Sequence, residues 1–283
     1  EKEGSFFAIQ EIWSPVYFPL SEQNYLPRSF TGKMKVENRY DFISLNELTI
    51  TWELVDFPGP EVIRRDASAG ETPHTVLNSG RVELPAIKAR NRGEISLNLP
   101  SDWRVRDALY LTANDADGRE IYTWSWMIPS PSEMNQRYIK RGEGQVEGWM
   151  EDQMIIMEWG DMSVYIHSET GQLVKIIKAG REISLGKGPR LIGGKSKPRE
   201  IDHQPDGYDY LVEASYEGNL KKVQWRMLPG GWLKLNYTYH FDGHAQKDYL
   251  GVSFDCPEEQ VSGMTWLGKG PYRVWKNRQK GMA

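Results

Sequence analysis

Residues 233–241, which read Leu-Lys-Leu-Asn-Tyr-Thr-Tyr-His-Phe, alternate apolar and polar side chains without a break. In a β-strand successive side chains point to opposite faces, so this period of two places Leu, Tyr and Phe on one face and the polar residues on the other. A helix would need apolar residues three or four positions apart. The segment therefore predicts a strand with one buried face and one face in water.

The same alternation recurs along much of the chain. The segments that show it most clearly are 33–40, 48–54 and 122–126. Clusters of Gly, Pro, Asn and Asp, such as 114–118 and 228–231, separate these runs and favour tight turns. Helical periodicity is almost absent. The sequence therefore predicts an all-β protein built from antiparallel hairpins.

Composition narrows the class of protein. The chain has 283 residues, and its 35 Lys and Arg against 39 Asp and Glu give a net charge of 35 − 39 = −4. This balance is that of an ordinary globular protein rather than a disordered one. No run approaches the roughly 20 apolar residues of a membrane span. Because Glu1-Lys2-Glu3 is too charged for a signal-peptide core, any export signal is expected outside this chain, and the compartment, periplasmic or cytoplasmic, is left open.

Cysteine and aromatic content add two further limits. A single cysteine, Cys256, excludes a disulfide framework within the chain and a Cys-rich zinc site, so a packed core must stabilise the fold. The 11 Trp, 14 Tyr and 8 Phe suit pleated sheets and also offer flat faces on which sugar rings stack.

The strongest domain boundary is Pro129-Ser130-Pro131-Ser132, since two prolines disfavour helix and interrupt a sheet just after an aromatic strand. The length, about twice a typical domain of roughly 150 residues, also suggests two domains. We expect an immunoglobulin-like β-sandwich at 1–129, a linker at 130–142 and a larger antiparallel sandwich at 143–283.

Residue chemistry alone yields no active site. The five histidines show no metal-ligand spacing, and no phosphate-binding loop or nucleophile with its base is evident. They are His74, His167, His203, His240 and His244. A basic C-terminal stretch, with Lys269, Arg273, Lys276, Arg278 and Lys280, stands alone in an acidic protein. We therefore expect no cofactor, no metal and no nucleic-acid partner.

Two stretches of the first half resemble a known family. The run from Val36 to Leu48, Val-Glu-Asn-Arg-Tyr-Asp-Phe-Ile-Ser-Leu-Asn-Glu-Leu, followed by Trp52-Glu53-Leu54, resembles the immunoglobulin-like domain after the catalytic barrel of large β-galactosidases of glycoside hydrolase family 2. Upstream, Gln10-Glu11-Ile12-Trp13-Ser14-Pro15-Val16 is similar to the segment by which that family leaves its barrel. The resemblance implies that the chain begins just after a barrel.

The second half resembles the last domain of the same enzymes, a large sandwich with the fold of galactose mutarotases. Thr265-Trp266-Leu267-Gly268-Lys269-Gly270-Pro271 is similar to its W-L-G-x-G-P motif, and residues 163–173 are similar to its opening hairpin. Arg273 and Trp275 replace the Glu and Tyr that follow in the family, and the R-A-P-T-D-N-D signature is missing near 188–200. The resemblance implies an incomplete last domain and an altered substrate specificity.

The resemblance implies a function for a parent protein. That protein would be a retaining β-glycosidase of the β-galactosidase type, acting on a terminal β-linked sugar with two carboxylates about 5 Å apart. Both would lie in the barrel, so this chain alone is expected to be inactive, with carbohydrate and the missing barrel as partners and a homo-oligomer as one outcome of unpaired strand edges. The alternative is a carbohydrate-binding or purely structural module, and a third reading is a mutarotase-related epimerase.

One stretch is singled out for substrate contact. Residues 188–210 are rich in Gly, Pro and charge, and we expect a long exposed loop there. The candidates for substrate binding are Arg190, His203 and Asp206. The alternative is a surface excursion without function.

Overall fold

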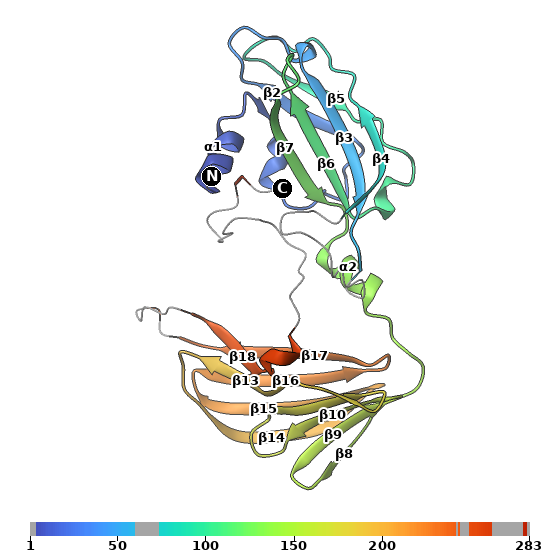
Figure 1. Cartoon of the computed structure of the whole chain (residues 1–283), viewed down its shortest axis with the longest axis vertical. Helices are drawn as coiled ribbons and strands as arrows, with labels where there is room; N and C mark the ends of the chain where they lie inside the picture. Colours follow the sequence, from blue (N-terminus) through green and yellow to red (C-terminus); the bar gives the residue numbers. More distant parts are fainter. Residues whose placement is uncertain (1–3, 60–73, 242, 244–248, 262–279, 282–283) are drawn as a thin grey trace. The chain divides into compact units, whose positions relative to one another are not determined.

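The computed structural model describes residues 4–59, 74–241, 243, 249–261 and 280–281, and it confirms a mostly β protein (Figure 1). Its helices are two short α-helices, α1 (Gly4–Ile12) and α2 (Pro131–Tyr138), and four 3₁₀ turns in the described residues. The 3₁₀ turns are η1 (Pro19–Glu22), η2 (Leu45–Glu47), η3 (Trp103–Val105) and η4 (Glu258–Gln260). Within the same ranges, no helix combines the length and apolar character needed to cross a bilayer.

The chain divides into two compact units, residues 1–138 with 265–283, and residues 139–264. Part of the expected linker is helical, because Ser130 and Glu133 cap α2. The Ser130 backbone N–H donates to the Glu133 carboxylate at 2.8 Å, and the Glu133 N–H donates to Ser130 Oγ at 3.3 Å. Proline fits the first turn of such a helix. The predicted limits of the two domains stay a prediction.

The first unit contains two antiparallel sheets. The three-stranded sheet has the order β1 (Val16–Tyr17), β2 (Lys33–Asn38) and β5 (Arg92–Ser96). The four-stranded sheet has the order β4 (Thr75–Arg81), β3 (Thr49–Asp56), β6 (Ala108–Asn114) and β7 (Glu120–Met127).

Alternating side chains of both sheets form the core of the first unit. Ile50, Trp52 and Leu54 on β3 are buried, and so are Tyr122, Trp124 and Trp126 on β7. The most buried of these aromatics, Trp126, donates its indole N–H to the Leu20 carbonyl at 3.0 Å. The faces expected from the period of two are therefore confirmed, and the two sheets pack as a sandwich.

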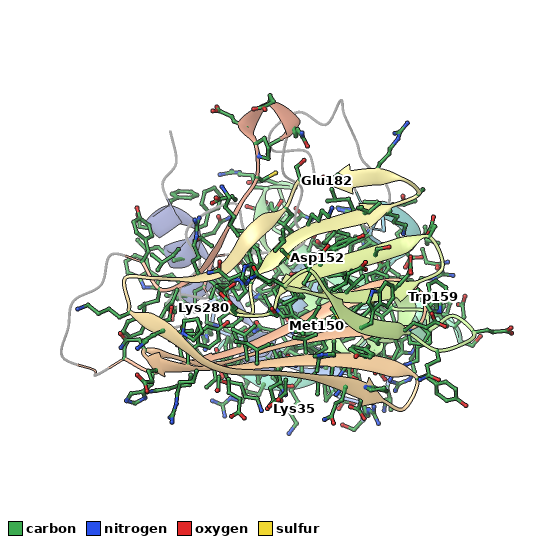
Figure 2. All side chains as sticks on the ribbon, turned by 90° about the horizontal axis from the view of Figure 1, so that it is seen from below. Lys35, Met150, Asp152, Trp159, Glu182 and Lys280 are labelled. Atoms are coloured by element: carbon green, nitrogen blue, oxygen red, sulfur yellow. The ribbon has the colours of Figure 1, made fainter. Side chains whose placement is uncertain are left out.

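The second unit also contains two sheets. The larger one has seven strands in the order β18 (Gly251–Asp255), β13 (Gly186–Ile192), β11 (Leu173–Lys178), β10 (Met162–His167), β9 (Met154–Trp159) and β8 (Glu147–Glu151), with β12 (Arg181–Ile183) beside β11. The smaller one has the order β14 (Ser196–Asp206), β15 (Asp209–Gly218), β16 (Leu220–Leu228) and β17 (Trp232–Tyr239). Figure 2 labels Met150 on β8, Trp159 at the end of β9 and Glu182 on β12.

The expected loop at 188–210 is wrong. Residues 186–192 form β13 and residues 196–206 form β14, which pairs with β15 along its whole length. Strand β14 is an edge strand, where proline is tolerated, and its register shifts between Pro198 and Glu200. An edge strand is mostly exposed, so β14 can carry charges and prolines where a buried strand would show alternating apolar residues. The hydrophobic pattern therefore does not predict this strand.

Several predictions fall outside the described residues. These are the motif at Thr265–Pro271, the replacements Arg273 and Trp275, and the basic residues Lys269, Lys276 and Arg278 with His244. Of the basic C-terminal stretch, Lys280 is described, and its Nζ lies 3.1 Å from a Glu11 carboxylate oxygen and 3.0 Å from one of Glu22. Lys280 therefore belongs to an ion cluster of the first unit.

Candidate functional site

An open concavity of about 730 Å³ lies in the second unit. Three strands and two loops meet there: the residues that line it come from β13, from the start of β14, from the end of β15, from the loop before β11 and from the loop between β13 and β14. They are Gln172, Arg190, Leu191, Gly194, Lys195, Ser196, Lys197, Glu217 and Gly218. One of the three predicted residues, Arg190, thus lies in a hollow of the surface.

The turn after β15 shapes the floor of this concavity. Gly218 has φ +101°, and a Cβ atom there would lie 2.4 Å from the Lys195 carbonyl oxygen, so glycine is required at this position. Next to it, the Asn219 backbone N–H donates to that same carbonyl at 2.7 Å, and the Lys195 N–H donates to Asn219 Oδ1 at 3.1 Å. These bonds hold the start of β14 against the end of β15.

The concavity carries more positive than negative charge. Arg190 forms an ion pair with Asp255, and Arg199 lies 3.6 Å from Glu217 across the rim. Lys195 and Lys197 supply two further cations. Such a surface can donate hydrogen bonds to hydroxyl or anionic groups. Glu217 is the single carboxylate among its described lining residues, whereas a retaining glycosidase uses two carboxyl groups about 5 Å apart.

His203 has a partner inside the sheet. It lies on β14, half-buried, and its Nδ1 is 2.7 Å from the hydroxyl of Tyr210 on β15. Burial raises the pKa of that tyrosine. The pair links the edge strand to its neighbour.

Asp206 belongs to a separate charge cluster at the end of β14. Its carboxylate lies 2.6 Å from the Arg226 guanidinium, which also lies 3.2 Å from Asp209. Asp209 is buried and binds Arg141 through both oxygens, at 2.5 and 3.1 Å. Burial alone would raise the pKa of Asp209, but the hydrogen bonds from Arg141 and Arg226 outweigh it and hold this pKa below its usual value.

The three predicted residues therefore do not form one site. Lys197, which lines the concavity, and Asp206 are nine residues apart on one strand, or about 30 Å at 3.3 Å per residue. The sequence reading missed Gln172, Glu217 and Gly218. The Glu-Gly-Asn sequence at 217–219 predicts a turn, but nothing in the sequence indicates that this turn lies beside Arg190.

The described residues contain no group of three or more His, Cys, Asp and Glu side chains that could hold a metal ion. A second, smaller concavity lies beside β1, β2 and β5, with Tyr17, Glu37 and Arg92 in its lining. The Glu37 carboxylate lies 3.1 Å from the Arg39 guanidinium and 2.9 Å from that of Arg92. The hydrogen bond from Arg39, and after it the one from Arg92, lowers the pKa of Glu37. Its charges are therefore neutralised by one another.

Comparison of the sequence with known protein families gives a match in the first unit. No curated protein matches the chain. Residues 34–115, which extend from β2 through β6 and make up less than a third of the chain, match the family model described as Beta-galactosidase, domain 4. Over these residues, the sandwich of the first unit is similar to a β-galactosidase domain 4.

Proposed function

We propose that the chain is a non-catalytic C-terminal part of a retaining β-glycosidase of the β-galactosidase type, which hydrolyses terminal β-linked sugars. The observation that carries this proposal is the match of residues 34–115 to Beta-galactosidase, domain 4. The segment from Val36 to Leu48, which resembles that family, lies inside the matched range. The first unit would then support a catalytic barrel that precedes it.

The state of the buried carboxylates supports a non-catalytic role. Asp107 and Asp209 are the buried acidic residues among those described, and each is held by arginine. Asp107 pairs with Arg137 and accepts the Phe57 N–H at 2.8 Å, while Asp209 binds Arg141 and Arg226. Asp209, whose pKa lies below its usual value, is a poor general acid, because the hydrogen bonds from its two arginines stabilise the ionised form.

The test is an assay with a nitrophenyl β-galactoside. We expect no turnover by the 283-residue chain. We expect turnover by a longer protein that joins this chain to its upstream barrel, provided that the barrel carries two catalytic glutamates. Turnover by the chain alone that a single Asp or Glu substitution within it abolishes would contradict the proposal. A longer protein without a barrel upstream of Glu1 would also contradict it.

Within such an enzyme, we propose that Arg190 contacts outer parts of an extended substrate. Its place in the concavity beside Lys195 and Lys197 supports this role. Arg190→Ala should raise KM for oligosaccharides several-fold, about 1 kcal/mol of binding, and leave kcat for a small aryl glycoside nearly unchanged. Lys178→Ala, an exposed cation on β11 outside the concavity, is the matched control. For His203 and Asp206, substrate contact stays a prediction.

The concavity also favours a second candidate, a carbohydrate-binding module. Calorimetric titration of the chain with galactosides and plant-type oligosaccharides separates the two. Saturable heat of binding would favour the carbohydrate-binding module if the Arg190→Ala variant lacks this heat and the Lys178→Ala variant retains it. If none of these sugars gives heat of binding, the result would favour a purely structural role for this chain.

A further inference from the structure

Among the described residues of the second unit, strand β17 is an edge of the smaller sheet. In the described part of the chain, β17 pairs with β16 alone, and the two run in unbroken register from Trp232 to Thr238. The strand contains neither Pro nor Gly, and Lys234 is its one charged residue. A long, regular edge of this kind presents backbone N–H and C=O groups to another strand.

The other edge of the same sheet is built differently. Strand β14 contains Pro198 and Pro205, and its register shifts between Pro198 and Glu200. It also carries five charged side chains and one histidine. These are the features by which natural sheets prevent pairing at an edge. In the first unit, the edge strand β7 is covered in part, since Met127 exchanges backbone hydrogen bonds with Asn24 and Leu26. Strand β17 thus differs from the edge strands β14 and β7.

The apolar face of β17 is only half covered. Leu233 and Leu235 pack against the core of the unit. Tyr237 and Tyr239 follow on the same face, yet they are 41% and 37% exposed. Their ring centroids lie 6.1 Å apart with the planes at 17°. The Phe241 ring packs against one side of Tyr239, with the centroids 5.5 Å apart. The exposed parts of the two tyrosines offer apolar surface to a strand that pairs with β17.

We propose that β17 pairs antiparallel with β17 of a second copy of this chain, with the twofold axis at Asn236. Residues opposite each other in a sheet share a face, so Leu235 meets Tyr237 of the partner and Leu233 meets Tyr239 of the partner. On the outer face, Lys234 meets Thr238 of the partner, and the two Asn236 amides face each other.

This register is compatible with the charges and the apolar side chains of the strand. The strand's one lysine lies opposite a neutral residue, so pairing brings no like charges together. Each tyrosine gains an aliphatic neighbour from the partner, a cross-strand pair that stabilises sheets. Two four-stranded sheets would become one continuous sheet across an isologous interface. This inference does not depend on the proposed glycosidase function.

The test is a charge exchange at Asn236, an exposed position on the outer face. Sedimentation velocity of the wild-type chain should show a concentration-dependent dimer. Asn236→Lys alone and Asn236→Asp alone each place like charges opposite one another, and each should weaken dimerisation roughly tenfold or more. An equimolar mixture of the two variants should dimerise again as a heterodimer, because opposite charges then face each other.

Controls separate pairing from folding. Gln204→Lys, an exposed position on the opposite edge strand β14, should dimerise like the wild type. Circular dichroism and the melting temperature should show that each variant folds. A wild-type chain that is monomeric at all concentrations would overturn the proposal. In that case, another segment of the same chain would be expected to cover the edge of β17. A dimer that both charged variants keep unchanged would overturn it as well.

Discussion

At the scale of single residues, a fully buried asparagine shapes the loop that follows β2. Asn38 is 0% exposed. Its Nδ2 donates to the carbonyl oxygens of Ile43 and Ile87, both at 2.9 Å, and its Oδ1 accepts the Tyr40 N–H at 3.1 Å. Every hydrogen-bonding atom of its amide is therefore used to fix backbone that has no strand partner.

Asn38→Ala should lower the free energy of unfolding of the first unit by about 3 kcal/mol, because a fully buried side chain loses its three hydrogen bonds to the backbone. Urea unfolding followed by tryptophan fluorescence measures the change. Asn46→Ala, an exposed asparagine in η2, is the control and should change it by less than about 0.5 kcal/mol. Equal effects of the two substitutions would show that the buried bonds contribute little.

Asp209 makes the second unit sensitive to acid. Its pKa in the folded chain lies below the ordinary value of 3.8, so its contribution to stability is present above pH 3.8 and is lost as the pH falls through the lowered folded pKa. Asp209→Asn should therefore be less stable than wild type by about 3 kcal/mol at pH 7, since Arg141 loses its anion and Arg226 keeps only Asp206. The difference in urea midpoint should shrink below pH 3.8. Asp202→Asn, an exposed change on β14, should show no such dependence.

At the scale of elements, β8 lies very close to β15. A Cβ atom at Gly148 on β8 would lie 2.3 Å from the ring of Tyr210, so only glycine fits there. The approach lets a strand of the seven-stranded sheet close one side of the second sandwich over a buried tyrosine. Its backbone, rather than a side chain, makes this contact.

Gly148→Ala should displace β8 and cost about 2 kcal/mol through overpacking. Hydrogen exchange should then speed up selectively for the amides of β8 and its neighbour β9. Met150→Ala, which removes a side chain that is 63% exposed on the same strand, should leave exchange unchanged. Uniform loss of protection over the whole unit would mean that β8 does not open separately.

At the scale of the whole molecule, each compact unit has a hydrophobic core of its own. Leu111 lies in the first core and Val223 in the second, and both are 0% exposed. We expect two unfolding transitions by calorimetry. Leu111→Ala should destabilise one of them by about 3 kcal/mol and leave the other in place, while Val223→Ala should do the reverse. A single transition that both substitutions shift equally would show that the units unfold together.

Local pattern was enough to predict the strands that are buried on one face. Residues 233–239 and the alternating segments around Trp52 and Trp124 lie in strands, because side-chain direction in a strand repeats every two residues and can be read along the chain. The prediction of a fully buried face at 233–241 is wrong, since the strand ends at Tyr239 and Tyr237 and Tyr239 are exposed. The family resemblance of residues 36–54 rests on the identity of the residues in that run, and the match of 34–115 agrees with it. Fold class and the first sandwich thus follow from the sequence by itself.

Long-range pairing decided the rest. Residues 188–210 read as a loop, yet β13 and β14 form there because other strands supply their hydrogen-bond partners. The distant strand β18 pairs with β13, and the next strand of a hairpin, β15, pairs with β14. The concavity likewise joins Gln172, Arg190 and Glu217, which are far apart in the sequence. An edge strand gains backbone bonds on one side and buries little, so its sequence carries no alternation to read. Only the tertiary structure could place Arg190 in a hollow and His203 and Asp206 elsewhere.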